Sequence, residues 1–390
     1  ANMQKRKERE MKKKILIVGA GRLGKGFLGE VFEAAEWHVA FLDHDPQIVK
    51  ELRGHSYQVK LYGTEGNVLR QVKNYSVYGC DAEKSCTSEV MTTDLIALCI
   101  YPENMKEAAE YLGPMISERA KSEGKPLSVI CCTNKNHIIQ EIQNMFEAAV
   151  DEEDRSWFRK NVAIRDVIIR RSTDYVGTDR LNLVSTATMS LLIQPPLFVD
   201  LKDVEWMELK DRLETLKEIK LYTYNSPHAT CAYAGYQKGY KTINEAERDP
   251  EIAKLMQEVL EEAVYGVSRE FDIEEKEVWD FCTMPKTKEE MTDTIFRVAL
   301  DPVRKLARND RLTGNAVFCL KHGLDPKALI QSIANGMAYD EPKDEKAMEI
   351  QALIEKNGIT EATSKVLGLP VEDAIVIRVA DIYTKMKTKG

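Results

Sequence analysis

The first half of the chain alternates short apolar runs with stretches of helical spacing. The apolar runs cover residues 14–18, 37–42, 94–100 and 127–132, and helical spacing follows at residues 27–32, 105–112 and 138–149. Continuous apolar strands between helices are typical of a parallel sheet covered on both faces. We therefore expect a doubly wound, mainly parallel α/β domain.

The second half, from about Val204, has mainly the spacing of helices. Apolar residues from Ile252 to Val267 recur every three or four positions, which indicates one helix face buried in a core. Gly323 is typical of a helix end, and residues 350–354 predict another amphipathic helix. Pro195-Pro196 favours a nearby domain junction. We predict a disordered extension at residues 1–10, an α/β domain at 11–200 and a helical substrate and catalytic domain at 201–390.

Composition narrows the class of protein. The chain has 390 residues, 43% of them hydrophobic, which is enough for one large core or two moderate ones. It has no run of 18 apolar residues, and its first ten residues lack the apolar centre of a signal peptide, so we expect a cytoplasmic protein without a membrane partner. The formal charge of −8 argues against a general nucleic-acid binder.

The cysteines and histidines have no spacing typical of metal ligands. The eight cysteines include the adjacent pair Cys131-Cys132, which lies inside an apolar run where cysteine behaves as a small hydrophobe. His38, His44 and His55 are scattered. We expect free thiols and no metal site.

A glycine-rich turn follows the first apolar run directly. Its sequence is Gly19-Ala20-Gly21-Arg22-Leu23-Gly24, and a helix and a second strand are predicted after it. In a Rossmann domain the first glycine permits the tight turn, the second lets the backbone approach a pyrophosphate, and the third allows the helix to pack closely on the strand. The alternative is a tight strand-to-helix turn that binds no nucleotide.

Asp43 ends the second predicted strand, about 20 residues beyond the glycines. A carboxylate at this position would accept hydrogen bonds from the ribose hydroxyls and repel a 2′-phosphate. The sequence therefore predicts NAD as the cofactor in preference to NADP.

A second group of polar residues lies near the middle of the chain. Lys220, Asn225 and His228 place an amine, an amide and an imidazole within nine residues. A buried lysine can accept the proton of a carbinol, an amide can donate to its oxygen, and an imidazole can orient a neighbouring hydroxyl. Asn134, beyond the strand predicted at 127–132, is a second candidate donor. The alternative is a solvated helix-end lysine followed by turn residues, since asparagine also favours turns.

Four separated motifs make the chain resemble the polyol-specific long-chain dehydrogenases and reductases, the mannitol dehydrogenase family. The resemblance covers nearly everything after Met11. The motifs are Gly19-Ala-Gly21-Arg-Leu-Gly24-Lys-Gly26-Phe27, His55-Ser-Tyr-Gln-Val59, Lys220-Leu-Tyr-Thr-Tyr-Asn225 with His228, and Pro302-Val-Arg304-Lys305-Leu306 with Asp310-Arg311-Leu312.

This resemblance implies an NAD-binding Rossmann domain, a helical domain and a metal-independent oxidoreductase. It implies Lys220 as the general acid and base, Asn225 and Asn134 as donors to the developing oxyanion, and His228 as a residue that positions a substrate hydroxyl. The implied reaction interconverts mannitol 1-phosphate and fructose 6-phosphate. Relatives also suggest a monomer.

The chain departs from the family pattern at three places. Thr133 stands where an acidic residue usually precedes the oxyanion asparagine, residues 100–103 replace a loop of small residues, and Ile169-Arg170-Arg171 replaces an Asp-Arg pattern. Arginine and lysine side chains suit a phosphate or a carboxylate equally. We therefore consider Arg170, Arg171, Arg304 and Lys305 as substrate ligands, with an interdomain salt bridge as the alternative for the last two.

Two other functions remain open at this point. The same mechanism would serve a reductase of a free ketose or of a keto-uronate such as fructuronate or tagaturonate. A protein that senses NADH without turnover is of another class, and such a sensor needs none of Lys220, Asn225, His228 and Asn134.

Overall fold

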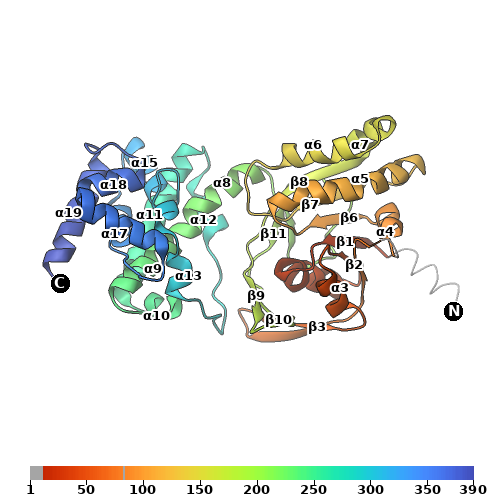
Figure 1. Cartoon of the computed structure of the whole chain (residues 1–390), viewed down its shortest axis with the longest axis horizontal. Coiled ribbons are helices and arrows are strands. Elements are labelled where there is room, and N and C mark those ends of the chain that lie inside the picture. The colour runs from red at the N-terminus through yellow and green to blue at the C-terminus, as the bar shows by residue number, and fades with distance from the viewer. Residues whose placement is uncertain (1–11, 82–83) are drawn as a thin grey trace. The chain divides into compact units, whose positions relative to one another are not determined.

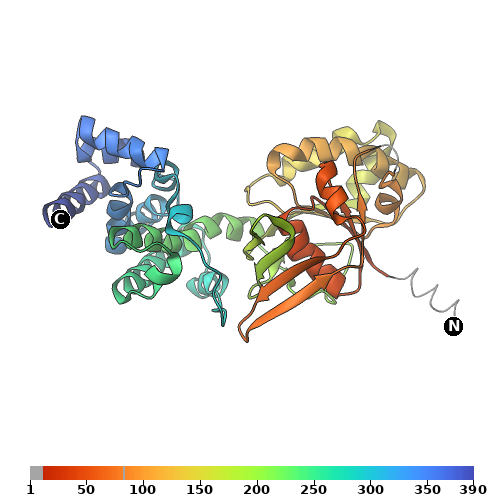
Figure 2. The ribbon, with the colours of Figure 1, turned by 60° about the horizontal axis from the view of Figure 1, so that its bottom comes forward.

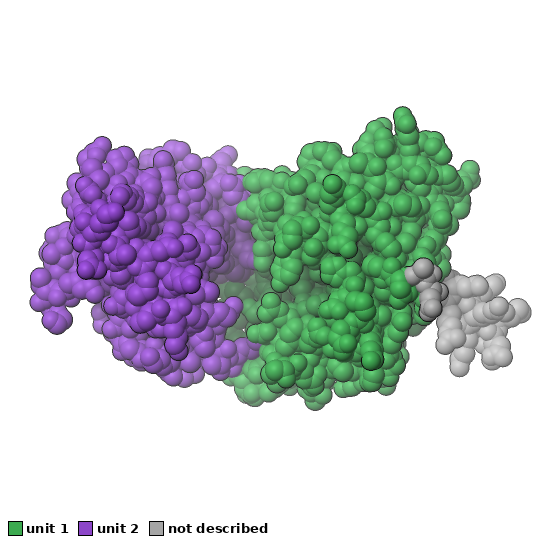
Figure 3. Space-filling view, in the orientation of Figure 1, with its two compact units in different colours: residues 1–214, 284–289 green, residues 215–283, 290–390 purple. Residues whose placement is uncertain are grey.

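The computed structural model describes residues 12–81 and 84–390. These residues form two compact units, green and purple in Figure 3. Unit 1 comprises residues up to Glu214 together with Met284–Glu289, and unit 2 comprises Thr215–Thr283 and Glu290–Gly390. The extension predicted at residues 1–10 lies outside the described residues.

Unit 1 is built on an eight-stranded sheet. Six of its strands are parallel and lie in the order β5-β2-β1-β6-β7-β8. When these six strands are numbered in chain order, their order is 3-2-1-4-5-6, as in a Rossmann fold. The sheet grows outward to one side from the first strand and to the other side from the fourth. These six strands are β1 (Lys14–Val18), β2 (His38–Leu42), β5 (Tyr75–Tyr78), β6 (Leu95–Leu98), β7 (Leu127–Cys131) and β8 (Val162–Ile168).

Two short strands extend the sheet beyond β8. β11 (Leu191–Ile193) pairs antiparallel with β8, and β12 (Met207–Leu209) pairs parallel with β11. Pro195-Pro196 lies between these two strands, inside unit 1. The sheet therefore continues past residue 200, where we had predicted the boundary between the domains.

Helices flank the sheet (Figure 1). Side chains alternate along each strand, and buried apolar residues line both faces. One face packs on the helix of the glycine motif, formed by η1 (Gly24–Gly29) and α2 (Glu30–Ala34), and on α3 (Pro46–Leu52). The other face packs on a second layer of helices. These are α4 (Thr87–Thr92), α5 (Met105–Lys121), α6 (Ile139–Ala149) and α7 (Arg155–Asn161).

A separate four-stranded sheet lies against the first face, in the order β4-β3-β10-β9. Residues 57–72 form the long hairpin of this sheet, which is drawn in orange in Figure 2. Lys288, from the later segment of unit 1, donates its backbone N–H to the Gly63 carbonyl at the tip of this hairpin (2.9 Å). The strands are β3 (Tyr57–Tyr62), β4 (Asn67–Val72), β9 (Thr173–Val176) and β10 (Asp179–Thr186).

Unit 2 is helical and has its own core of apolar residues. Its longest helix is α11 (Pro250–Glu270), which buries the apolar stripe predicted at 252–267. α8 (Leu213–Thr223) begins at the end of unit 1. The other helices are α9 (Asn225–Gln237), α10 (Ile243–Glu247), α12 (Glu275–Cys282), α13 (Ile295–Ala299), α14 (Pro302–Lys305), α15 (Thr313–Lys321), α16 (Lys327–Met337), α17 (Glu345–Asn357), α18 (Ile359–Leu367) and α19 (Ala374–Thr388).

The predicted fold class is confirmed: a mainly parallel Rossmann sheet is followed by a mainly helical region. The predicted helix at 105–112 is longer than expected and continues through Pro114 to Lys121. Gly323 follows the end of α15 with φ of 85°, as a helix-ending glycine should. Among the described residues, no helix is both long enough and apolar enough to cross a membrane.

A buried ion pair joins the helix of the glycine motif to the segment after β8. The Arg171 side chain is 0% exposed and lies 3.6 Å from Glu30, while its guanidinium stacks 3.9 Å from the centre of the Phe27 ring. Burial lowers the pKa of Arg171 to about 10, although Glu30 opposes the shift. Burial likewise raises the pKa of Glu30 despite the two nearby arginines, Arg171 and Arg70.

We expect Glu30→Ala to destabilise the protein by about 3 kcal/mol, because it leaves the Arg171 charge buried without its counter-ion. The double variant Glu30→Leu/Arg171→Met should recover most of this loss, since an apolar pair avoids the desolvation cost. Urea unfolding of the two variants and the unchanged protein measures both effects. A double variant less stable than Glu30→Ala would contradict this explanation.

Candidate cofactor and catalytic sites

The three glycines of the motif occupy three different environments. Gly19 has φ of 100°, and an added Cβ would lie 2.3 Å from the Cys99 carbonyl oxygen at the end of β6. A Cβ on Gly24 would lie 2.1 Å from the Gly19 carbonyl oxygen. A Cβ on Gly21 would meet nothing within 4 Å, so its backbone faces open space. The loop thus has a tight turn, a close helix-to-strand contact and one exposed stretch of backbone.

The helix after this loop begins with the π-helical turn η1. Such turns are frequent at functional sites. The Tyr57 hydroxyl, from β3, donates to the Lys25 carbonyl within this turn (2.8 Å). Ala20 is buried, Leu23 is half-buried, and the exposed Arg22 guanidinium lies 3.4 Å from Asp174.

Asp43 lies at the carboxyl end of β2, and the loop holds its carboxylate in place. One carboxylate oxygen accepts from the Ala20 N–H (2.8 Å) and the other from the Asp45 N–H (2.9 Å). Each oxygen can accept a second hydrogen bond. Asp43 thus has the location and the acceptor capacity for a ribose, beside the open backbone at Gly21.

A cavity of about 130 Å³ adjoins Asp43 at the carboxyl ends of β1, β2 and β6. This is the edge at which a Rossmann domain binds its dinucleotide. Two residues of its wall were not predicted from the sequence: Asn104, in the turn before α5, and Tyr111, in α5. Neither belongs to a strand end or to a recognised motif. The wall includes Val18, Gly19, Asp43, Ile100, Asn104 and Tyr111.

Asn134 is exposed just beyond the carboxyl end of β7, at the predicted strand end. The preceding Thr133 is buried, and its hydroxyl accepts from the Lys135 N–H (3.3 Å). A hydroxyl at this position shapes the turn. An aspartate could make the same turn hydrogen bond, so the turn does not require an acidic residue at 133.

The predicted catalytic residues of unit 2 lie around the junction of α8 and α9. Lys220 is in the last turn of α8, Asn225 begins α9, and His228 follows one turn later. All three are partly exposed. The Lys220 ammonium lies 6.0 Å from the centre of the Tyr224 ring. Asn134 belongs to unit 1, whereas these three belong to unit 2.

Aromatic residues between the polar ones anchor this junction in unit 2. The Tyr224 hydroxyl donates to the Phe281 carbonyl (2.7 Å), and Tyr222 packs edge-on against Phe318 (5.0 Å between ring centres). The Asn315 amide donates to the Tyr222 carbonyl (2.9 Å). In the Lys-Leu-Tyr-Thr-Tyr-Asn sequence the two anchoring tyrosines thus lie between the partly exposed Lys220 and Asn225.

An aspartate lies beside His228. The His228 Nε2 is 3.6 Å from Asp293, and Asp293 accepts a hydrogen bond from Arg297 (2.7 Å). Burial acts to raise the pKa of Asp293, but the neighbouring His228 and Arg297 hold it well below its usual range. The carboxylate stays charged and favours one orientation of the imidazole. Sequence reasoning missed Asp293, which is 65 residues away along the chain.

The two basic residues of α14 differ in exposure. Arg304 is largely exposed and lies 3.5 Å from Asp301. Lys305 is buried and donates to the Val298 carbonyl (2.6 Å). Burial lowers the pKa of Lys305 to about 8, helped by Arg311 and Arg304. Arg304 is therefore the more accessible of the two to an anionic ligand.

Arg170 and Arg171 are both buried in unit 1. Arg170 donates to the Ser190 carbonyl (3.1 Å) and lies 3.9 Å from Glu208 on β12. Arg171 faces Glu30, as described above. This placement gives Arg171 a structural role in place of the predicted contact with substrate, because its side chain has no exposed surface.

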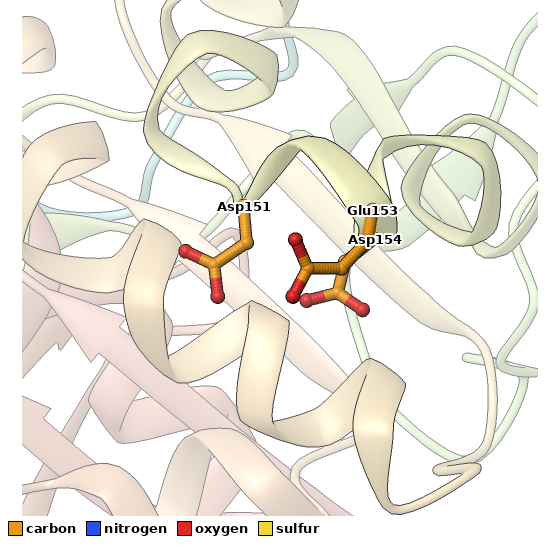
Figure 4. Close-up of side chains that lie close together, drawn as sticks. All are labelled: Asp151, Glu153 and Asp154. Atoms are coloured by element: carbon orange, nitrogen blue, oxygen red, sulfur yellow. The ribbon is translucent and has the colours of Figure 1, made fainter.

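One acidic group in unit 1 has the spacing of a metal site. Asp151, Glu153 and Asp154 converge in Figure 4. The Lys121 ammonium lies among them, 2.6 Å from Asp151 and 3.7 Å from Glu153, and it also contacts Asp154. This lysine offsets part of their negative charge, so the group is explained as an ion-pair network between one lysine and three carboxylates.

Comparison with known families agrees with the two-part architecture. The mannitol dehydrogenase Rossmann domain matches residues 13–190, and the mannitol dehydrogenase C-terminal domain matches residues 212–387. The chain therefore belongs to the mannitol dehydrogenase family. It is an oxidoreductase of the polyol dehydrogenase class, whose Rossmann domain takes a nicotinamide cofactor.

Similar curated proteins span the same length. Mannitol-1-phosphate 5-dehydrogenase of Aspergillus clavatus is 28% identical and matches 97% of this chain and all of its own. The enzyme of the same name from Clostridium acetobutylicum is also 28% identical, with the same coverage, and that of Thermoanaerobacter pseudethanolicus is 25% identical over 96% of this chain and 98% of its own.

Two solved structures share the fold. D-sorbitol dehydrogenase in substrate-free form superposes with a TM-score of 0.75 at 14% identity, covering 97% of this chain and 94% of that one. Mannitol 2-dehydrogenase of Pseudomonas fluorescens, in a ternary complex with NAD and D-mannitol, gives 0.65 at 14% identity, covering 98% and 93%.

The glycine loop provides a matched pair of substitutions. We expect Gly21→Ala to leave the melting temperature unchanged and to weaken NADH binding about tenfold or more, because the methyl group occupies the space where backbone meets pyrophosphate. Gly24→Ala should instead destabilise the fold by about 2 kcal/mol, since its Cβ would overlap a carbonyl. Calorimetric titration and thermal unfolding separate the two effects. Normal NADH affinity in Gly21→Ala would exclude this loop as the pyrophosphate site.

Proposed function

We propose that this protein is an NAD-dependent dehydrogenase that interconverts mannitol 1-phosphate and fructose 6-phosphate. The observation that carries the proposal is the arrangement at the α8–α9 junction, where Lys220, Asn225 and His228 are partly exposed on an anchored scaffold. A protein that only binds NADH would need none of these groups. The relatives named mannitol-1-phosphate 5-dehydrogenase, which match nearly the whole chain, support the choice of substrate.

NAD is the cofactor that the residues of unit 1 fit best. Gly21 leaves backbone open to a pyrophosphate, and Asp43 is held at the end of β2 by the Ala20 N–H. A fixed carboxylate at that point favours ribose hydroxyls and repels the 2′-phosphate of NADP. When bound, the nicotinamide would supply the hydride acceptor or donor.

Lys220 is assigned the proton transfer. In oxidation of the polyol its neutral amine accepts the hydroxyl proton as the C–H hydride leaves, and in reduction of the ketone its ammonium returns that proton. Asn225 donates a hydrogen bond to the oxygen on which negative charge develops. His228, oriented by Asp293, positions a neighbouring substrate hydroxyl.

Arg304 is the proposed phosphate ligand because its guanidinium is largely exposed. A guanidinium binds a carboxylate equally well. A keto-uronate such as fructuronate or tagaturonate is therefore the second candidate substrate, with the same proton transfer.

Lys220→Ala should lower kcat for reduction of fructose 6-phosphate by about 100-fold or more, because proton transfer loses its acid. NADH binding should persist, since the assigned cofactor residues belong to unit 1. The loss of NADH absorbance on adding fructose 6-phosphate, fructose, fructuronate or tagaturonate measures both the substrate choice and the role of Lys220. The exposed Lys254→Ala serves as the control. Full activity in Lys220→Ala would exclude this lysine from the chemistry.

Arg304→Ala should raise KM for fructose 6-phosphate about tenfold or more, through loss of charge-assisted hydrogen bonds. Its KM for fructose, which has no phosphate, should not change. An equal rise in both KM values would show that Arg304 acts on the shape of the site and does not bind phosphate.

A further inference from the structure

Another cavity of unit 1 shares no lining residue with the glycine loop or Asp43, although Arg53 also lines a neighbouring cavity of about 620 Å³ that includes Asp43. The first of these two cavities has a volume of about 610 Å³, within the range of small-molecule sites. Its wall is formed by the end of α3, the start of β3 and the segment that leads into β5. Lys73, Tyr75 and Ser76 lie at the amino end of β5, while Val77 lies near its carboxyl end and Lys84 beyond it, so the cavity follows this edge strand of the sheet.

Its wall is cationic. Arg53, His55, Lys73 and Lys84 all line it, together with the hydroxyl groups of Ser56, Ser76 and Tyr75. Among the described residues that line this cavity, none is an aspartate or a glutamate. This is unexpected in a chain with 63 acidic and 55 basic residues.

None of these four basic side chains has a carboxylate within 4.0 Å among residues 12–81 and 84–390. The Arg53 guanidinium reaches only the Val77 carbonyl (3.4 Å), and the Lys84 ammonium lies over the Tyr78 ring (5.2 Å). Basic side chains elsewhere in the chain are often paired, as Lys238 is with two carboxylates at 3.1 and 2.7 Å. The clustered charges repel one another, and a bound anion would offset that repulsion.

Hydrogen bonds hold the wall in shape. The single proton of the Tyr75 hydroxyl is shared between the carbonyls of His55 (2.6 Å) and Leu52 (3.1 Å), which fixes the turn after α3. The Leu52 carbonyl also accepts from the His55 N–H (3.2 Å), so both carbonyl oxygens have a hydrogen-bond donor. The same turn carries the start of the His55-Ser-Tyr-Gln-Val59 motif, for which the proposed reaction has no role.

We propose that this cavity, formed around Arg53, His55 and Lys73, is a second anion site that binds a small phosphorylated molecule. A phosphate suits the wall because it accepts charge-assisted hydrogen bonds from guanidinium and ammonium groups and further ones from serine hydroxyls. The volume admits a ligand as large as a nucleotide. The proposal does not depend on the identity of the sugar substrate.

The test is calorimetric titration with pyrophosphate and with adenosine monophosphate, in the presence of saturating NADH so that the cofactor site is filled. Both probes carry phosphate, and only adenosine monophosphate carries a nucleoside. A difference in affinity therefore shows whether the site binds the phosphate alone or a nucleotide. The double variant Arg53→Gln/Lys73→Gln removes two exposed charges from the wall. Its matched control, Lys160→Gln/Lys202→Gln, removes two exposed charges elsewhere on unit 1.

We expect saturable binding of at least one probe to the unchanged protein and to the control, and affinity lower by about tenfold or more in Arg53→Gln/Lys73→Gln, because charge-assisted hydrogen bonds are lost. The binding should weaken with salt. No saturable binding, or the same affinity in all three proteins, would overturn the proposal. Failure of fructose 6-phosphate turnover leaves this result unaffected.

A second measurement needs no variant. Acetylation of lysines in the unchanged protein, followed by mass spectrometry, should show Lys73 and Lys84 protected by the probe that binds, while the exposed Lys160 and Lys202 react equally with and without it. Equal acetylation of Lys73 with and without the probe would overturn the proposed location.

Discussion

The fold of unit 1 depends on the close approach of backbone to backbone at the end of β1. An added Cβ on Gly19 would meet the Cys99 carbonyl at 2.3 Å, and one on Gly24 would meet the Gly19 carbonyl at 2.1 Å. Two strands and a helix therefore meet with no side chain between them. This contact also leaves the Gly21 backbone open, so the packing that closes the fold and the geometry that receives a cofactor arise from the same three glycines.

In unit 2, too, one short segment provides both packing and functional groups: the anchoring tyrosines lie between partly exposed polar residues. Tyr222 and Tyr224 attach the α8–α9 junction to neighbouring helices. The partly exposed residues Lys220, Asn225 and His228 thus have a fixed backbone beneath them. A fixed backbone matters for catalysis, because proton transfer and oxyanion stabilisation both fall steeply with misplacement.

Much of this could be predicted from sequence, because local patterns have local causes. The strands of the parallel sheet follow from continuous apolar runs, and the glycine turn follows from Gly19 and Gly24, where an added Cβ would overlap a backbone carbonyl. The four-stranded sheet was missed, although Tyr57–Tyr62 and Asn67–Val72 flank a turn with glycines at both ends, which is a hairpin signal. Asp293 had no local signal, since it reaches His228 only through tertiary packing.

Basic residues show most clearly where a sequence pattern stops being informative. Arg171 and Lys305 were expected to bind an anion, yet Arg171 is enclosed beside Glu30 and Lys305 donates to a backbone carbonyl. By contrast, Arg53 and Lys73 belong to no recognised anion motif, and the structure leaves them exposed around a cavity without a paired carboxylate. Charge alone marks a residue as capable of binding phosphate. Whether it is available to a ligand depends on which of its donors the fold has already used, and that is decided by contacts between residues far apart in the chain.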